Sequence, residues 1–214
     1  MITIHHLGVS QSDRIVWLME ELNLPYELKW YDRGEDFLAP PEFRALHPAG
    51  TAPIITDGDL VMAESTAIVE YISQRHGGGA LSVQPDDPDY PHYLFWMQFN
   101  NNLQSALFIK LAVQSTGVTP DAGGPMMATT QRREDGIYAA LEQRLGESDY
   151  LGGPEFSCAD IMSMFNLTSL TMLGARAIDD SMPNTKAYVE RVSARPAYQK
   201  AMSIAGPAAS RPAG

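Results

Sequence analysis

Two short polar stretches of the sequence stand where a ligand could meet the start of a helix. Ser10 separates an apolar segment from an amphipathic one, and Glu64-Ser65 precede a second amphipathic segment. A helix N-terminus presents free N–H groups and partial positive charge, which favour a bound thiolate or carboxylate. A serine hydroxyl there can donate to a sulfur, and lowering a thiol pKa by about two units requires about 2.7 kcal/mol of differential stabilisation. Each stretch is also consistent with a simple helix cap, so these residue types alone leave both interpretations open.

The chain has few side chains for thiol, disulfide or metal chemistry of its own. Cys158 is its one cysteine, which excludes an internal disulfide, a CxxC redox pair and a cysteine-based metal cluster. The five histidines lack HExxH or other ligand spacing, so we predict no bound metal. A thiol that takes part in chemistry is therefore expected to come from a ligand.

Composition and charge narrow the range of partners. The chain has 214 residues, a formal net charge of -11 and 44% hydrophobic residues, which is ordinary for a globular protein. The acidic balance offers no electrostatic footprint for nucleic acid or for an anionic membrane surface. No apolar run approaches the roughly 20 residues that span a bilayer, and the first residues show no basic segment followed by an apolar one. We therefore expect a cytoplasmic protein that binds small molecules and protein partners, with no nucleic acid and no membrane among them.

The first 78 residues alternate strand and helix signals. A stripe of apolar residues predicts a first helix that ends before Pro25, and the tight turn Asp57-Gly58-Asp59 predicts a hairpin. A further helix opens at Glu64-Ser65 and ends at Gly77. The expected elements are strand 2–7, helix 15–22, strand 26–31, a loop or short helix around 40–43, strands 53–56 and 60–62, and helix 64–75.

After residue 78 the strand signals stop. The segment 79–90 is rich in Gly, Pro and Asp, which is typical of an interdomain linker. Beyond it we predict only helices, over 93–116, 126–145, 157–173, 184–194 and 197–205. Ser157 and Asp160 form a capping-box variant, for which we favour a structural role, and Cys158 is expected to be a buried, inert thiol.

A family resemblance rests on four stretches in a fixed order, which are Ser10-Gln11-Ser12-Asp13-Arg14 with the following WLMEEL run, His47 through Pro53, Asp57 through Ser65, and Ser157-Cys158-Ala159-Asp160. Nearly the whole chain resembles the cytosolic glutathione transferase superfamily, and its first 80 residues are most similar to the bacterial and fungal serine-type members. The resemblance implies an α/β thioredoxin-like N-terminal domain over residues 1–78, which binds glutathione. It further implies the linker 79–90 and an all-α C-terminal domain over residues 91–214, which holds the electrophile.

The resemblance implies that Ser10 is the catalytic residue that activates the thiol of glutathione. In the superfamily this residue is Tyr, Ser or Cys, and the first strand carries His5 and His6 but no tyrosine. Ser12 is the alternative to Ser10, and Gln11 is a candidate amide behind it. We interpret the two histidines as strand residues rather than bases.

The resemblance also implies which residues hold glutathione. Thr51, Ala52 and Pro53 correspond to the stretch with the family's cis-proline, where the exposed backbone of Ala52 pairs with the cysteinyl part of the tripeptide. Glu64 receives the γ-glutamyl ammonium, and Ser65 offers a hydroxyl, N–H groups and the helix dipole to the adjacent α-carboxylate.

Two features depart from the family pattern. Thr51 stands where the family often has a lysine for the glycyl carboxylate, and Leu38 occupies the other usual polar position. Either the backbone, Arg33 or a residue of a partner subunit replaces that cation, or glutathione binds more weakly. The run Asn100–Asn102 lies inside a long predicted helix, where asparagine lowers local stability, and one of its side chains is expected to cap a kink or line the cleft.

The resemblance therefore implies a homodimeric enzyme that activates glutathione as a thiolate and transfers it to small hydrophobic electrophiles. Glutathione is the co-substrate, and no metal takes part. Two alternatives stay open: a glutathione-dependent isomerase, dehalogenase or ether-cleaving enzyme on the same fold, and a non-catalytic glutathione transferase-like binding module. A thiol–disulfide oxidoreductase is disfavoured because the active-site cysteine is absent.

Overall fold

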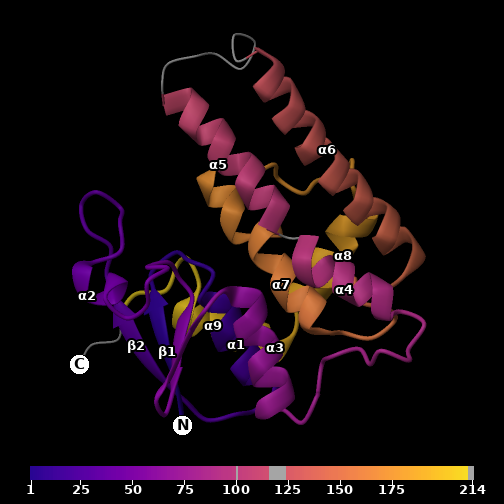
Figure 1. The fold of residues 1–214 in the computed structure, drawn as a ribbon. Helices are drawn as coiled ribbons and strands as arrows, with labels where there is room; N and C mark the ends of the chain where they lie inside the picture. Colours follow the sequence, from indigo (N-terminus) through magenta and orange to yellow (C-terminus); the bar gives the residue numbers. More distant parts are fainter. Residues whose placement is uncertain (100, 116–123, 212–214) are drawn as a thin grey trace. The chain divides into compact units, whose positions relative to one another are not determined.

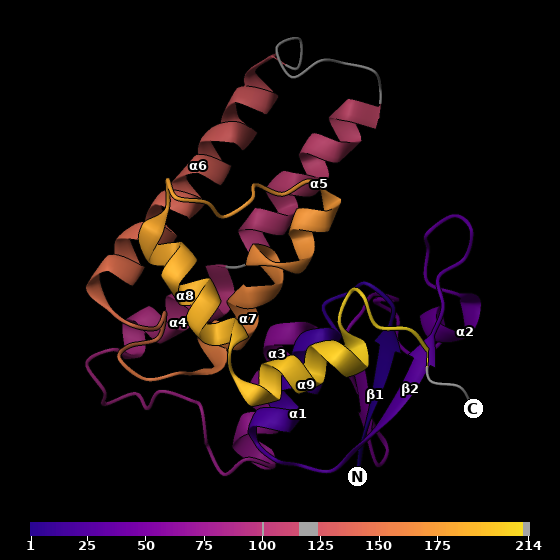
Figure 2. The ribbon, with the colours of Figure 1, turned by 180° about the vertical axis from the view of Figure 1, so that it is seen from behind.

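The chain forms two compact units, which we describe separately (Figures 1 and 2). The computed structural model describes residues 1–99, 101–115 and 124–211. One unit comprises Met1–Ser82 with Arg191–Gly214, and the other comprises Val83–Glu190. The predicted boundaries at residues 78 and 91 stay predictions.

The N-terminal unit is built on a mixed four-stranded sheet with the order β2-β1-β3-β4. Its strands are β1 (Ile2–Leu7), β2 (Tyr26–Tyr31), β3 (Ile54–Asp57) and β4 (Leu60–Ala63). β1 pairs with β2 in parallel and with β3 antiparallel, and β4 forms an antiparallel hairpin with β3. The sheet and its connecting helices confirm the predicted α/β thioredoxin-like fold.

Three helices of this unit surround the sheet or close its loops: α1 (Asp13–Glu21), α2 (Pro41–Arg44) and α3 (Ser65–Arg75). Every residue from Asp13 to Met19 is buried, so α1 is covered on more than one side. α3 buries Ile68, Val69 and Ile72, which lie on one stripe of the helix. Phe43 of α2 joins a buried cluster with residues of the strands.

The C-terminal helix α9 (Pro196–Ala205) packs against α1 of the N-terminal unit (Figure 2). The ring of Tyr198 meets Trp17 edge to face at 4.9 Å between centroids, and Arg195 donates two hydrogen bonds of 2.7 Å to the carboxylate of Glu21. The sequence had assigned these residues to the helical domain 91–214. They lie in the N-terminal unit because α1 has an apolar and acidic face that the sheet does not cover.

The other unit contains helices and no strand among its described residues. Tyr150 and Gly153 form one antiparallel bridge within a turn. Its helices are α4 (Tyr90–Phe99), α5 (Asn101–Ser115), α6 (Gly124–Glu147), α7 (Cys158–Leu167), the 3-10 helix η2 (Ser169–Leu173) and α8 (Pro183–Ser193), whose residues from Arg191 on are assigned to the other unit. The prediction of an all-helical region is confirmed.

Two predicted helices differ in detail from the observed ones. The helix expected over 157–173 ends at Leu167, where Thr168 has φ -121° and ψ -73°, and the chain continues as η2. The helix expected over 93–116 corresponds to α4 and α5, which lie on either side of residue 100. Asn100 and Thr116 lie outside the described residues.

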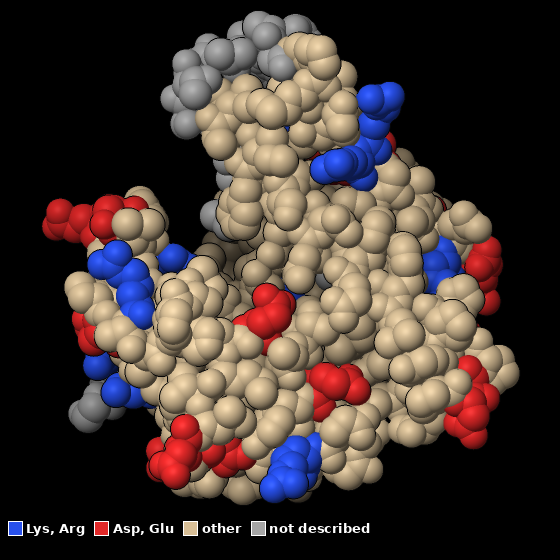
Figure 3. Space-filling model, in the orientation of Figure 1, with Lys and Arg blue, Asp and Glu red and all other residues tan. Residues whose placement is uncertain are grey.

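Charged side chains of both signs are scattered over the face seen in Figure 3, and neither sign forms a continuous surface there. Within the described part of the chain, none of the helices is both long enough and apolar enough to cross a membrane. The same residues contain no group of three or more His, Cys, Asp or Glu side chains that could hold a metal ion.

Candidate active site at one end of the sheet

The strand register brings the predicted site segments to the same end of the sheet. His5 of β1 pairs with Ile54 of β3, and Ile54 pairs with Ala63 of β4. Because β3 runs antiparallel to both neighbours, the loop after β1, the residues before β3 and the residues after β4 meet at this end. These are the loop with Ser10, the stretch Thr51–Pro53 and the pair Glu64-Ser65, so the structure collects all the predicted binding segments of the first domain.

Ser10 lies in the loop between β1 and α1 and is 7% exposed. Its Oγ donates to the carbonyl oxygen of Leu7 at 2.6 Å and lies 2.7 Å from Ser12 Oγ. The backbone N–H of Ser12 donates to Ser10 Oγ at 3.3 Å. Ser12 occupies the N-cap position of α1, and neither serine hydroxyl satisfies the first turn in the manner of a side-chain cap. The Ser10 hydroxyl therefore donates to the end of the strand and contacts the N-cap residue of α1.

Both histidines lie in β1, as expected, and their rings take opposite faces of the strand. His5 Nδ1 lies 3.0 Å from the hydroxyl of Tyr31, and its Nε2 lies 3.3 Å from Thr56 Oγ1. Burial lowers the pKa of His5, and the charge of Lys29 lowers it further. His5 is thus bound to the neighbouring strands on both sides.

His6 turns toward the start of α1. Its Nδ1 lies 2.8 Å from Ser12 Oγ, and its ring packs against Trp30 at 4.3 Å between centroids. The ring is 0% exposed, and this burial lowers the pKa of His6 from 6.5 to about 4. Among the described residues, no group forms a hydrogen bond with His6 Nε2. His6 is therefore a neutral imidazole at physiological pH, and the sequence did not indicate this contact.

A buried arginine connects the starts of α1 and α3. Arg14 Nη1 donates to Ser65 Oγ at 3.3 Å, and Ser65 Oγ donates to Gln11 Oε1 at 3.3 Å. Burial lowers the pKa of Arg14 to about 10, while the charges of Asp13 and Glu64 raise it. The guanidinium therefore stays charged at neutral pH and holds two predicted site segments together. The sequence placed Gln11 near the site but missed Arg14, because a basic residue in a first helical turn is usually solvated.

Two of the remaining predicted binding residues, Thr51 and Glu64, are exposed, whereas Pro53 is buried. The Ala52-Pro53 peptide bond is cis, which confirms that expectation. Ala52 lies two residues before Ile54, where the pairing of β3 with β1 begins, and Thr51 is exposed. Glu64 is exposed and has a φ of 76°, a conformation that is costly for a residue other than glycine. Strained residues of this kind concentrate at functional sites.

Arg33 contacts the backbone of the loop that leads to Ser10. Its Nε donates to the carbonyl oxygen of Gly8 at 2.8 Å, its Nη2 to that of Val9 at 3.1 Å, and its Nη1 to that of Phe37 at 2.8 Å. Val9 has a φ of 51°, which is strained for a β-branched residue. The guanidinium of Arg33 therefore supports this loop, whereas the sequence had raised it only as a substitute for the missing lysine. Leu38, which occupies the other position where the family usually has a polar residue, is 56% exposed.

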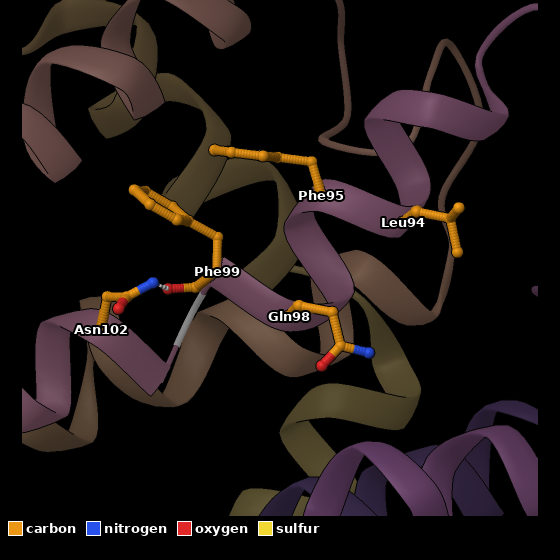
Figure 4. Close-up of a pocket in the computed structure, with 5 residues that line it drawn as sticks. All are labelled: Leu94, Phe95, Gln98, Phe99 and Asn102. Carbon is orange, nitrogen blue, oxygen red and sulfur yellow. Dashed lines mark hydrogen bonds between the residues drawn. The ribbon is translucent and has the colours of Figure 1, made fainter.

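The helical unit has a shallow pocket of about 370 Å³ at the junction of α4 and α5 (Figure 4). Leu94, Phe95, Gln98, Phe99 and Asn102 line it. The rings of Phe95 and Phe99 stack at 4.4 Å, and Asn102 Nδ2 donates to the carbonyl oxygen of Phe99 at 3.1 Å. Asn102 thus lines the pocket and binds a carbonyl at the end of α4. The Asn101 carbonyl accepts a hydrogen bond from Ser105 Oγ at 3.0 Å, and Asn100 lies outside the described residues.

The start of α7 has the capping box that the sequence predicted. The buried carboxylate of Asp160 accepts hydrogen bonds from the backbone N–H groups of Leu151 and Ser157, from Ser157 Oγ and from the hydroxyl of Tyr188, at 2.8 to 3.2 Å. Burial raises the pKa of Asp160, and the four donors oppose that shift. Cys158 is fully buried beside this network.

Comparison with known proteins identifies the family. The model of the glutathione S-transferase N-terminal domain matches residues 10–75, and that of the glutathione S-transferase C-terminal domain matches residues 106–196. Glutathione S-transferase 3 of Schizosaccharomyces pombe is 30% identical over 210 residues, which cover 92% of this chain and 85% of that protein. The chain therefore belongs to the glutathione S-transferase family.

Solved structures agree with this assignment. The crystal structure of a glutathione S-transferase from Actinobacillus pleuropneumoniae is 32% identical, with a TM-score of 0.81, and the match covers 100% of this chain and 97% of that one. A theta class glutathione S-transferase from Xanthomonas axonopodis pv. citri, solved with glutathione bound, is 26% identical, with a TM-score of 0.68 and coverage of 96% and 98%. These relatives do not favour the isomerase, dehalogenase, ether-cleaving or non-catalytic alternatives.

Proposed function

We propose that this glutathione transferase binds glutathione at the end of its N-terminal sheet and that Ser10 stabilises the thiolate there. The observation that carries the proposal is the convergence of the Ser10 loop, the Thr51–Pro53 stretch and the Glu64-Ser65 pair at that end. Ser10 lies in the loop two residues before the N-cap of α1, whose N-terminal partial charge adds to the effect of a hydroxyl donor. The glutathione bound in the Xanthomonas relative supports the choice of ligand.

The binding residues keep the roles that the family resemblance implies. Thr51, Ala52 and Pro53 offer backbone groups to the cysteinyl part of glutathione, and exposed Glu64 meets the γ-glutamyl ammonium. Ser65 is 3% exposed, and its hydroxyl already contacts Arg14 and Gln11. We therefore assign the recognition of the α-carboxylate first to the free N–H groups at the start of α3.

The proposed reaction needs no covalent enzyme intermediate. The thiol of bound glutathione loses its proton to water, because the Ser10 hydroxyl and the helix N-terminus favour the thiolate over the thiol. The sulfur then forms a bond to an electrophilic carbon, and the leaving group departs with the electron pair. The protein contributes proximity and a lowered thiol pKa.

Further parts of the proposal concern the electrophile and the assembly. The exposed aromatic side chain of Phe95, with Leu94 and Phe99, provides apolar surface for a small hydrophobic electrophile within the helical unit. We propose the domains 1–78 and 91–214 with the linker 79–90 as the family's division along the chain, in which α9 returns from the second segment to pack on α1 of the first. We further propose a homodimer as in the family, no metal, and a cytoplasmic location. The cytoplasmic location is supported by a single cysteine that forms no disulfide.

The Ser10→Ala variant tests the central assignment. The loss of one hydrogen bond to a charged sulfur should lower turnover of chlorodinitrobenzene at neutral pH by about 10- to 100-fold, which corresponds to about 1.5 to 3 kcal/mol. The pKa of bound glutathione, read from the ultraviolet absorbance of its thiolate, should rise, and activity should partly recover at higher pH.

Ser73→Ala is the matched control for this experiment. Ser73 Oγ donates to the carbonyl oxygen of Ala80 at 2.6 Å and lies 2.8 Å from Ser82 Oγ, so it loses the same kinds of contact away from the site. Turnover and bound thiol pKa should stay at the wild-type values in this control. A Ser10→Ala variant that keeps both values would make the assignment of Ser10 untenable.

A further inference from the structure

Three buried side chains form a row of hydrogen bonds that ends at Ser10. His6 Nδ1 lies 2.8 Å from Ser12 Oγ, and Ser12 Oγ lies 2.7 Å from Ser10 Oγ. Ser10 Oγ in turn lies 2.6 Å from the carbonyl oxygen of Leu7. Exposed fractions of 0% for His6, 0% for Ser12 and 7% for Ser10 leave little room for water to replace these contacts.

A count of protons gives each hydrogen bond its direction. A serine hydroxyl has one proton, and a carbonyl oxygen only accepts. The Ser10 proton is therefore directed at Leu7, so the hydrogen bond between the two serines must be donated by Ser12. Since this uses the only proton on Ser12 Oγ, the hydrogen bond between His6 and Ser12 must be donated by His6 Nδ1.

The same count assigns the tautomer of His6. A neutral imidazole that carries its proton on Nδ1 has an unprotonated Nε2, and Nε2 is the atom with no hydrogen-bond partner among the described residues. The lowered pKa of His6, which results from burial, agrees with a neutral ring. The three donors therefore all point the same way, from His6 through Ser12 and Ser10 to the carbonyl oxygen of Leu7.

We propose that His6 and Ser12 are positioning residues that keep the oxygen of the Ser10 hydroxyl accepting a hydrogen bond, so that its own proton stays available for donation. Donation from Ser12 Oγ and from the Ser12 N–H occupies the lone pairs of Ser10 Oγ. A hydroxyl that accepts hydrogen bonds is polarised and becomes a stronger donor. The inference rests on the proposed role of Ser10 as the group that contacts the sulfur.

Binding of the thiolate then requires a rotation of the Ser10 O–H bond, in which Ser10 Oγ keeps the hydrogen bond of 2.7 Å from Ser12 Oγ and gives up the longer one of 3.3 Å from the Ser12 N–H. The proton moves from the direction of the Leu7 carbonyl oxygen to the direction of the sulfur and stays on Ser10, so no proton is transferred along the row. A hydrogen bond to a charged acceptor is roughly twice as strong as one between neutral groups, which favours the sulfur. His6 is therefore no general base in this arrangement.

Variants of the full-length protein test this inference. Ser12→Ala and His6→Phe should each lower kcat with glutathione and chlorodinitrobenzene by about 3- to 10-fold and raise the pKa of bound glutathione. The KM for glutathione should change by less than about twofold, because neither residue contacts the ligand. His6→Phe keeps a ring against Trp30, and His6→Asn, which keeps a donor near the position of Nδ1, should restore most of the rate.

The decisive comparison repeats Ser12→Ala in the Ser10→Ala background. If Ser12 acts through Ser10, the second substitution should change neither kcat nor the thiol pKa further. An undiminished effect of Ser12→Ala in that background would overturn the inference, since Ser12 would then act on the sulfur without Ser10. Ser10→Ala alone with a wild-type thiol pKa would instead overturn the proposed function, so the two failures are distinct.

A spectroscopic measurement tests the proton count independently of activity. Long-range proton–nitrogen NMR spectra of the wild-type protein should show His6 as the neutral tautomer with the proton on Nδ1. A proton on Nε2 would mean that the row runs in the opposite direction, and the inference would be wrong. If His6→Phe does not fold, the Ser12 variants and this spectrum still decide the question.

Discussion

The starts of α7 and α1 use similar residue types in opposite ways. At α7, Ser157 and Asp160 form a network in which the carboxylate accepts four hydrogen bonds. At α1, Ser10 and Ser12 make no side-chain cap and instead form a row that leads from His6 to a backbone carbonyl. The first network has every acceptor satisfied by the protein itself. The second ends in the Ser10 hydroxyl, which can donate to a better acceptor in place of the Leu7 carbonyl oxygen.

Because of this difference, we expect the network at α7 to serve stability and the row at α1 to serve the proposed function. A buried polar network with all its hydrogen bonds made stabilises one conformation, and any ligand that enters must break a hydrogen bond of similar strength. Under the proposed function, the ligand at Ser10 breaks one hydrogen bond to a neutral carbonyl, and the hydroxyl then donates to a charged sulfur instead. Substitutions at α7 should therefore change mainly the free energy of unfolding, and substitutions near Ser10 should change mainly the thiol pKa.

The largest effect is expected for Asp160→Ala. It leaves two backbone N–H groups and two hydroxyls buried without their acceptor, so we expect the free energy of unfolding to fall by about 3 to 5 kcal/mol, measured by urea denaturation. The pKa of glutathione bound to the folded fraction should stay at the wild-type value. Asp160→Asn keeps one acceptor oxygen and should lose less stability. A thiol pKa raised as far as in Ser10→Ala would remove the distinction between the two networks.

The next largest effect is the pH dependence that His6 gives to the free energy of unfolding. The pKa of His6 is about 4 in the folded protein and 6.5 when unperturbed. Between these pH values, His6 binds a proton in the unfolded chain and stays neutral in the folded one. The folded state thus loses stability as the pH falls from about 6.5 to about 4, by about 3 kcal/mol in all. His6→Phe removes this dependence.

Urea denaturation of the wild type and of His6→Phe at several pH values measures this pH dependence of stability. The stability of the wild type relative to His6→Phe should fall steadily between neutral pH and pH of about 4, and the subtraction cancels the contribution of His5. A constant difference across this range would show that His6 is not held neutral by burial, and would weaken the comparison with α7.

Much of the N-terminal sheet was predictable because its strand signals are local. Ile2–Leu7 and Tyr26–Tyr31 have the predicted bounds, and the turn Asp57-Gly58-Asp59 fixes the hairpin of β3 and β4. The packing of Tyr198 on Trp17 was not predictable, because no local pattern connects residues so far apart in the sequence. The short 3-10 helix after Leu167 was missed for a related reason, since apolar residues continue past the point where the helix ends.

The candidate site was predictable in its parts but not in its contacts. The family pattern indicated Ser10, the Ala52-Pro53 bond and Glu64, and the strand register explains why they meet. The link from His6 to Ser12 was missed, although one signal was present: adjacent residues of a strand face opposite sides, so one of the two histidines had to face a helix. Which of them does so depends on the register with β2 and β3, which the sequence does not show.

The smallest effect on stability is expected for Arg33→Met. Arg33 is exposed, so the carbonyl oxygens of Gly8, Val9 and Phe37 can bind water in its absence, and we expect a loss of about 1 kcal/mol or less. The strained φ of 51° at Val9 persists only while its surroundings hold it, so the loop should relax and displace Ser10. We therefore expect kcat to fall by about threefold and the bound thiol pKa to rise, both by less than in Ser10→Ala.

Adding Val9→Gly to Arg33→Met should restore much of the rate, because glycine adopts this φ without strain. A raised KM for glutathione with unchanged kcat would instead mean that Arg33 binds the ligand itself, and the loop before α1 would then hold its conformation without it.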